Sequence, residues 1–183
     1  FYDFLIGVTS FFRDPDAFAA LQEQILPRLF DVASPSALVR VWVPGCSSGE
    51  EAYSIAMLLK EQLDLLNESF PVQIFATDID RRAIEQARAG LYPDSIAADV
   101  SPERLRHFFT PADDGFYRVN KGIRDMLIFS VQDVIKDPPF SKLDLLSCRN
   151  LLIYMSADLQ HKLIPMFHYA LNPNGTLFLG TSE

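Results

Sequence analysis

The chain has 183 residues, of which 49% are hydrophobic, enough for one globular domain whose core needs no disulfide support. Its two cysteines, Cys46 and Cys148, each end an apolar run, which favours buried thiols in an intracellular, cytoplasmic protein. The net charge of −8 and the lack of a basic run argue against nucleic-acid binding, which needs positive patches. The sequence shows neither a leader pattern nor an apolar run long enough for a membrane span, so we expect no membrane insertion.

Residues 1–36 are expected to form a helical lead-in. Asp14-Pro15 is typical of a helix start, because proline is tolerated in the first turn, and apolar residues follow it at helical spacing. The residues that share this apolar face are Phe18, Leu21, Ile25 and Leu29. One side of this helix is therefore predicted to pack against the remainder of the chain.

Residues 37–183 alternate between strand and helix patterns. The first predicted elements are a strand over 38–43, a helix over 50–66, a strand over 72–77 and a helix over 81–89. Asp80 is suited to cap the second of these helices, and Gly90 is suited to end it. Such alternation predicts an α/β fold, a Rossmann-like, mainly parallel sheet flanked by helices.

The pattern weakens over residues 91–124, where prolines and a glycine separate short elements. We interpret this region as a small inserted subdomain with a helix near 103–109 and a hairpin at 116–119. The elements predicted after it are strands over 126–130 and 143–147, a helix over 158–171, a turn at Asn174-Gly175 and a strand over 176–179. Pro165 lies inside that last helix and is expected to weaken it.

Two of the predicted strands end in residues that suit a nucleoside-bearing cofactor. The first runs into a glycine turn, Gly45 to Gly49, followed by a helix with Glu50 and Glu51 in its first turn, and the second ends at Asp78. In an open α/β sheet, ligands bind beyond the carboxyl ends of the strands, where helix N-termini and an acid that can hold a ribose meet. The same pattern also occurs in α/β folds that bind no nucleotide.

Four segments, taken in order, resemble the chemoreceptor glutamate methyltransferases of bacterial chemotaxis, the CheR family. They are GCSSGEEAYSIA, ATDID with the later GLYP, SCRNLLIY with the downstream Gln160, and NGTLFLGTSE, and the opening VTSFFRDPDAF also matches. The wording of IFATDID, YRVNKGIRD and KDPPFSKLDLLSCRNLLIY is most similar to the form found in large fusions of the chemotaxis methylesterase and methyltransferase. The resemblance implies a class I methyltransferase domain excised from a longer protein.

This resemblance implies an enzyme that transfers a methyl group from S-adenosylmethionine to glutamate side chains of chemoreceptors, leaving S-adenosylhomocysteine. The implied partners are the cytoplasmic helices of the receptors and other domains of a larger fusion protein. The family also uses upstream basic residues to hold acidic receptor helices, so we expect this acidic chain to bind receptors weakly by itself. The inserted subdomain is where the family would grip a receptor tail peptide.

The resemblance also assigns residues to the methionine and ribose parts of the cofactor. Thr9 and Arg13 match the family's residues at the methionine end, with Arg13 pairing with the carboxylate as a planar guanidinium can. Glu51 matches the acceptor of the methionine ammonium, and Asp78 matches the acid that holds the ribose hydroxyls. Gly45 lets the backbone approach the cofactor closely.

The remaining assignments concern the adenine and the transferred methyl group. Asp133 and Val134 match the pair near the adenine, Arg149 and Asn150 match the pair around the sulfur, and Tyr154 matches a tyrosine beside the methyl. Arg13 and Tyr154 are thus the expected catalytic, orienting residues. The chain departs from the family at Gly7, where some members have a cofactor-contacting Asn, and at Asp133, where Asn is usual.

Three other interpretations compete with this one. Gly45 to Gly49 fits the G-x-S-x-G nucleophile turn of hydrolases, but no oxyanion-loop motif precedes it and the neighbouring acids would have no role. Asp137 to Phe140 imitates the D-P-P-F motif of amino-methyltransferases acting on nucleic acid, but it precedes a strand instead of following one. A non-catalytic cofactor-binding or receptor-docking module in a signalling fusion is the third. The three histidines lack metal-ligand spacing, and we expect no metal.

Overall fold

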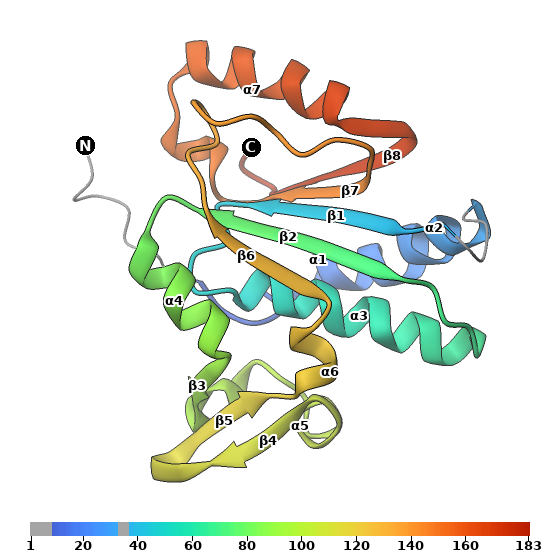
Figure 1. Ribbon diagram of the computed structural model, residues 1–183, viewed down its shortest axis with the longest axis vertical. Coiled ribbons are helices and arrows are strands. Elements are labelled where there is room, and N and C mark those ends of the chain that lie inside the picture. The colour runs from blue at the N-terminus through green and yellow to red at the C-terminus, as the bar shows by residue number, and fades with distance from the viewer. Residues whose placement is uncertain (1–8, 33–36) are drawn as a thin grey trace.

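The computed structural model describes residues 9–32 and 37–183. A five-stranded sheet in the order β6-β2-β1-β7-β8 forms the centre, and all four of its strand pairs are parallel. Its strands are β1 (Val39–Pro44), β2 (Val72–Asp78), β6 (Leu127–Val131), β7 (Leu143–Cys148) and β8 (Leu171–Leu179). Helices lie on both faces of this sheet, as Figure 1 shows. The predicted α/β architecture is confirmed.

The chain enters the described fold through α1 (Pro15–Ala20), a π-helical turn η2 (Leu21–Ile25) and α2 (Leu26–Val32). These elements confirm the predicted N-terminal helix, which begins at Pro15 after Asp14. Phe18, Leu21 and Phe30 are buried in the main core. The predicted division into domains over 1–36 and 37–183 falls beside residues 33–36, which lie outside the described part, and it stays a prediction.

Two helices follow the first two strands with the predicted bounds, α3 (Glu50–Leu66) and α4 (Arg81–Ala89). Local chemistry sets the ends of α4. The carboxylate of Asp80 accepts the backbone N–H of Arg82 at 2.8 Å, and Gly90 takes the left-handed conformation, with φ 62°, that ends a helix without a steric penalty. Both interactions involve residues next to each other in the sequence, so the bounds of α4 could be predicted.

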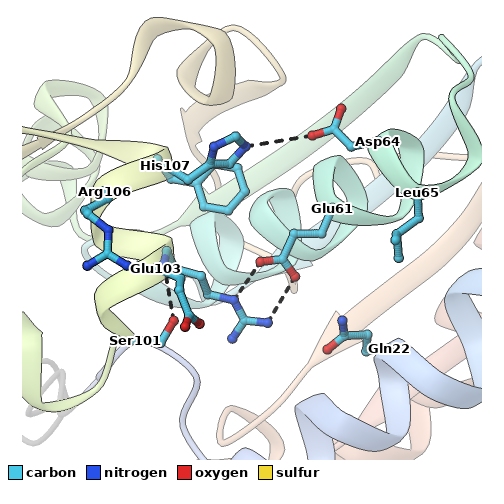
Figure 2. A pocket seen from close by; sticks show the side chains of 10 residues that line it. Gln22, Glu61, Asp64, Leu65, Ser101, Glu103, Arg106 and His107 are labelled. Atoms are coloured by element: carbon cyan, nitrogen blue, oxygen red, sulfur yellow. Dashed lines mark hydrogen bonds and ion pairs between the residues drawn. The ribbon is translucent and has the colours of Figure 1, made fainter.

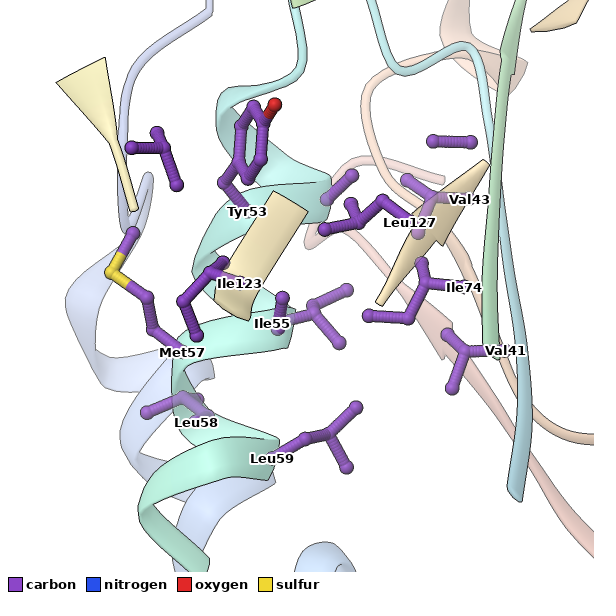
Figure 3. Close-up of a cluster of buried hydrophobic side chains, with 14 of the residues drawn as sticks. Val41, Val43, Tyr53, Ile55, Met57, Leu58, Leu59, Ile74, Ile123 and Leu127 are labelled. Atoms are coloured by element: carbon purple, nitrogen blue, oxygen red, sulfur yellow. The ribbon is translucent and has the colours of Figure 1, made fainter. Parts of the chain in front are cut away.

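The main core lies between α3 and one face of the sheet (Figure 3). Side chains of α3 such as Ile55 and Leu59 face Val41 of β1 and Ile74 of β2. The buried residues on α3 form an unbroken run from Ala52 to Leu59, because the helix is covered on more than its sheet side. Leu66, near the end of the helix, is 43% exposed.

A second, smaller sheet lies beyond α3 and α4, away from the central one (Figure 1). It is antiparallel, in the order β3-β5-β4, and corresponds to the region predicted as an insertion. Its elements and their neighbours are β3 (Leu91–Pro93), η3 (Asp94–Ala98), α5 (Pro102–Phe108), β4 (Phe109–Ala112), η4 (Asp113–Gly115), β5 (Phe116–Val119) and α6 (Lys121–Arg124). Residues 116–119, predicted as a hairpin, form only one of its strands, β5, which pairs with β4. The predicted helix over 103–109 ends one residue early because Phe109 pairs with Val119 as part of β4.

The opposite face of the central sheet is covered by α7 (Ala157–Ala170) and by the segment between β6 and β7. Trp42, Leu163 and Phe167 are among the buried residues of this second cluster. Pro165 does not interrupt α7, since it lies on the exposed side, where the carbonyl that lacks an N–H partner can face water.

The end of the described chain differs from the sequence-based prediction. The turn predicted at Asn174-Gly175 lies within β8, where the pairing with β7 shifts register between Leu143 and Leu145. Asn174 adopts a positive φ of 68°, which accommodates the irregularity. The pairing with β7 therefore extends to both sides of the predicted turn. Among the described residues, no helix combines the length and apolarity that crossing a bilayer requires.

Candidate cofactor and methyl-transfer site

The carboxyl ends of β1, β2, β6 and β7 lie at one edge of the central sheet. Pro44 is in register with Thr77, and Asp78 with Val131, so the loops that follow these strands begin side by side. This edge brings together the loop after β1, Asp78 and the segment after β7. The sequence-based placement of the candidate site at strand ends is consistent with this arrangement.

The loop from Gly45 to Gly49 is a compact turn that needs glycine at both ends. Gly45 and Gly49 have φ values of 68° and 97°, which side chains rarely tolerate. A Cβ on Gly49 would lie 2.9 Å from the Cβ of Ala87 on α4, and one on Gly45 would lie 3.0 Å from Leu151. The loop is therefore packed between neighbouring elements, and a side chain at either glycine would require its neighbours to move.

Asp78 holds this loop at the end of β2. Its Oδ2 accepts the backbone N–H of Ser47 at 2.7 Å, and its Oδ1 accepts that of Asp80 at 2.9 Å. Each carboxylate oxygen has a second lone pair, so both can accept a further hydrogen bond from a ligand hydroxyl. The side chain is half-buried, which keeps those positions within reach of a molecule at the strand ends.

Glu51, in the first turn of α3, lies within a polar cluster at the same edge. It accepts hydrogen bonds from Ser147 Oγ at 3.0 Å and from Arg149 Nη1 at 3.1 and 3.2 Å. Burial raises the pKa of Glu51 above its usual value, and the nearby charge of Arg149, the Ser147 hydrogen bond and the charge of Arg13 act in the opposite direction. The carboxylate is thus held by positive charge on one side.

Arg149, in the segment after β7, binds the segment that precedes α1. Its side chain is 1% exposed, and its Nη2 donates to the Asp14 carboxylate and to the Arg13 carbonyl, both at 2.8 Å. The guanidinium also lies over the rings of Phe18 and Phe178, at 5.1 and 4.9 Å from their centroids. Its Nε is buried without a hydrogen-bond partner. Arg149 therefore anchors the N-terminal segment as well as lining the edge.

The segment before α1 carries Thr9 and Arg13, which are both half-buried. Phe12 and Asp14, on either side of Arg13, have positive φ values of 50° and 58°, and the Phe12 N–H donates to Ser54 Oγ at 3.0 Å. This unusual backbone brings the Arg13 carbonyl to Arg149. Gly7, one of the two positions where the chain departs from the family pattern, lies outside the described residues.

The remaining predicted residues follow β6 and β7. Asp133 and Val134 lie in the turn after β6, and the Asp133 side chain accepts the N–H of Ile135 at 2.9 Å. Asn150 has a positive φ of 62°, and Tyr154 ends the short helix η5 (Leu152–Tyr154) with 51% of its surface exposed. Their roles toward a ligand stay predictions.

Sequence reasoning missed three residues of this site. Ser147 and Asp14 both contact predicted residues directly, and Glu183 accepts hydrogen bonds from the segment after β7. Ser147 could have been found, because it lies two residues before Arg149 at a strand end. Asp14 was interpreted only as part of a helix start, and no local signal distinguishes its second role.

A separate cleft of about 1020 Å³ lies between α5 and the C-terminal half of α3 (Figure 2). Within it, Arg104 binds Glu61 at 2.8 and 3.0 Å, and His107 lies 3.8 Å from Asp64. None of the predicted site residues lines it. Because those residues gather at the carboxyl ends of the strands instead, the size of this cleft does not make it the stronger candidate.

The arrangement also weakens the two competing enzyme interpretations. Ser47 would be the hydrolase nucleophile, but the histidines that could activate it lie on α5 and α7, and its own N–H binds Asp78. Phe140 of the D-P-P-F segment stacks on Phe75, with centroids 4.1 Å apart, at the middle of the sheet instead of its carboxyl edge.

Burial raises the pKa of Cys46 well above its usual value, so its thiol stays protonated.

The family model described as CheR methyltransferase, SAM binding domain, matches residues 7–183. A 104.1 kDa protein of Rhodobacter capsulatus is 42% identical over 181 residues, which are 99% of this chain and 19% of that protein. A chemotaxis protein methyltransferase of Vibrio parahaemolyticus is 36% identical over 178 residues, 96% of this chain and 64% of the relative. The chain thus spans less than two thirds of these relatives, and the first of them contains the matching segment within a much longer protein.

Solved structures show the same fold. A protein of Methanococcus maripaludis named as a putative S-adenosylmethionine-dependent methyltransferase aligns over 91% of this chain and 56% of its own, with a TM-score of 0.50 and 15% identity. The central sheet with helices on both faces is therefore that of class I methyltransferases.

The residues at the strand ends fit the cofactor of this family, S-adenosylmethionine. Its ribose hydroxyls need acceptors, which the Asp78 carboxylate offers, and its ammonium group needs hydrogen-bond acceptors, which the Glu51 carboxyl carries. On the match over residues 7–183 and this fit, the chain belongs to the CheR methyltransferase family and contains its S-adenosylmethionine-binding domain.

Proposed function

We propose that the protein methylates the side-chain carboxylates of glutamates in bacterial chemoreceptors, as part of chemotaxis signalling. When bound, S-adenosylmethionine supplies a methyl group activated by attachment to a positive sulfur. The observation that carries the proposal is the convergence of the family motifs at one sheet edge, where Asp78, Glu51 and Arg149 come together. The relatives named as chemotaxis protein methyltransferases support methyl transfer in chemotaxis.

The reaction needs little chemical help from the protein. A carboxylate oxygen of the substrate forms a bond to the methyl carbon as the bond between carbon and sulfur breaks, and the product is a methyl ester. No proton moves, because a glutamate is already ionised near neutral pH. Placing the two groups in line can contribute as much as about 7–11 kcal/mol, so orientation is the main task of the site.

The proposed binding roles divide the site into two ends. Arg13 would pair with the methionine carboxylate beside Thr9, and Glu51 would accept the ammonium. Asp78 would hold the ribose, with Asp133 and Val134 near the adenine. Arg149 supports the first end, since its hydrogen bond to the Arg13 carbonyl ties that segment to Glu51.

Tyr154 and Asn150 are proposed to lie beside the transferred methyl. Tyr154 is 51% exposed, so a receptor glutamate could reach its hydroxyl from solvent. A hydroxyl there can orient the incoming carboxylate by hydrogen bonding without taking its proton.

The roles of Tyr154 and Arg13 can be separated by two measurements, calorimetry with S-adenosylhomocysteine and transfer of a radiolabelled methyl to receptor fragments. Tyr154→Phe should lower turnover at least about tenfold with little change in affinity, because only an orienting hydrogen bond is lost. Arg13→Ala should weaken cofactor binding about tenfold or more by removing a charge-assisted contact.

Tyr169→Phe is a matched control, since Tyr169 is 84% exposed on α7. Normal turnover in Tyr154→Phe, or normal affinity in Arg13→Ala, would contradict the corresponding role. Cofactor binding by the unchanged protein without transfer to any receptor fragment would instead favour a non-catalytic module.

A further inference from the structure

The segment that follows β7 is held in place by the side chain of Glu183, which lies just beyond the carboxyl end of the neighbouring parallel strand β8. The Oε1 atom of Glu183 accepts the backbone N–H groups of Leu151 at 2.7 Å and Leu152 at 3.1 Å. Its Oε2 accepts the N–H of Gly180 at 2.6 Å. One carboxylate thus binds three backbone donors and joins the end of β8 to the segment that carries Asn150 and Tyr154.

A second side chain holds the same segment from the opposite direction. Gln160, on α7, donates through Nε2 to the carbonyl of Leu152 at 2.9 Å and to that of Met155 at 3.3 Å. Glu183 therefore binds N–H groups where the short helix η5 begins, and Gln160 binds the carbonyl of its first residue, Leu152, and that of Met155 just after its end. We call these two side chains the η5 clamp.

The backbone that the clamp holds has an uncommon conformation. Asn150 has a φ of 62°, in the left-handed region that residues other than glycine adopt rarely. The N–H of the next residue, Leu151, donates to Glu183 at 2.7 Å, and the Leu151 side chain packs on Gly45 of the glycine turn. The clamp thus contacts the segment after β7 directly and, through Leu151, the glycine turn after β1.

We propose that Glu183 and Gln160 are positioning residues for methyl transfer, which set the orientation of Asn150 and Tyr154 by fixing the backbone between them. This inference rests on the proposed function, because it assumes that these two residues act on the cofactor and substrate. Charge matters for Glu183, since hydrogen bonds from N–H groups to a carboxylate are stronger than those to a neutral acceptor. Neither clamp residue need touch the cofactor.

Glu183→Gln tests the clamp with little change in shape. The amide keeps one oxygen for Leu151 and Leu152, but its nitrogen cannot accept the N–H of Gly180. We expect amide hydrogen exchange at Leu151 and Leu152 to speed up about tenfold, and turnover to fall by about ten- to a hundredfold with the receptor KM little changed, because small misplacements are costly in oriented reactions. Glu183→Ala should have larger effects, and Glu85→Gln, on the exposed side of α4, should have none.

Gln160→Ala provides an independent variant if Glu183→Ala fails to fold, as judged by circular dichroism. It should speed exchange at Met155 and lower turnover in the same way. Exchange and turnover equal to those of the unchanged protein in both Glu183→Gln and Gln160→Ala would overturn the proposal. If the unchanged protein transfers no methyl to receptor fragments, the proposed function fails, whereas faster exchange together with weaker S-adenosylhomocysteine binding in the variants would still support the clamp.

Discussion

Arg149 contacts more parts of the site than its neighbours do. Its guanidinium binds Glu51 on α3, Asp14 before α1 and the carbonyl of Arg13, while two aromatic rings cover it. A buried ion pair adds little net stability, because desolvation of the two charges offsets their attraction. Its value here is positional, since it brings two distant segments to the same edge of the sheet.

Replacing Arg149 by Met should lower the free energy of unfolding by about 3 kcal/mol, near the lower end of the cost of breaking a buried pair. A cost at the lower end of that range is expected because Asp14 is 50% exposed, so water can solvate it once its partner is gone. Glu51 is only 13% exposed, and the loss of its partner accounts for most of the cost. Urea denaturation measures the change, with Arg106→Met on the exposed side of α5 as a control. A loss as small as that of the control would show that the pair is not structural.

The raised pKa of Glu51 predicts how stability depends on pH. Because the folded state favours the protonated form of Glu51, it binds more protons than the unfolded chain, and stability falls as pH rises from the ordinary carboxyl pKa through the raised one. Glu51→Gln removes this contribution, so unfolding free energies measured between acidic and neutral pH should decline less steeply than in the unchanged protein. Burial also raises the pKa of Glu50, so in Glu51→Gln the unfolding free energy should still decline with pH because of Glu50. An unchanged slope in Glu51→Gln would show that Glu51 does not titrate in this way.

Among the elements, the turn between β1 and α3 links the two sheets. Tyr92 of β3 donates its hydroxyl to the carbonyl of Ser48 at 2.5 Å, and Gly49 packs against Tyr92 and Ala87. The small sheet therefore supports the turn that the cofactor is expected to approach. The packing leaves no space for a side chain on Gly49, and its φ of 97° disfavours one in any case.

Gly49→Ala should destabilise the protein by about 1–3 kcal/mol or more, from backbone strain and from the contact with Ala87 together. Gly122→Ala is the matched substitution, since a Cβ there meets nothing within 4 Å, and it should be neutral or stabilise α6 by about 0.5–1 kcal/mol. Thermal or urea unfolding of both variants measures the difference. Equal stability of the two would mean that the turn can relax around a side chain.

At the scale of the whole molecule, ligand binding should be visible as stability. S-adenosylhomocysteine at about 100 times its Kd should raise the free energy of unfolding by about 2.7 kcal/mol, because it binds only the folded chain. Asp78→Asn should reduce this stabilisation at the same ligand concentration, since a charge-assisted contact to the ribose is worth about 1.5–3 kcal/mol. The same ligand-induced shift in both proteins would argue that Asp78 does not hold the ribose.

Much of the architecture was predictable from the sequence, because its signals are local. The bounds of α3 and α4 match the predicted ones, since helical periodicity, the Asp80 cap and Gly90 act within a few residues of each helix end. The strands that end at Pro44 and Asp78 were recognisable as apolar runs followed by glycine or acid. The parallel order of the sheet followed from the alternation of strand and helix.

Other features depend on contacts between distant residues, which no local pattern encodes. The short strand β3 exists because Leu91 and Pro93 find β5 as a partner, and its three residues are too few for a periodic signal. Arg149 pairs with Asp14, 135 positions away in the sequence, and Glu183 accepts hydrogen bonds from the backbone of Leu151 and Leu152. The sequence by itself determined the elements and the acids at their ends, whereas only the tertiary structure decided which polar groups pair, because buried charges and N–H groups take the partners that the packed chain brings within hydrogen-bond distance.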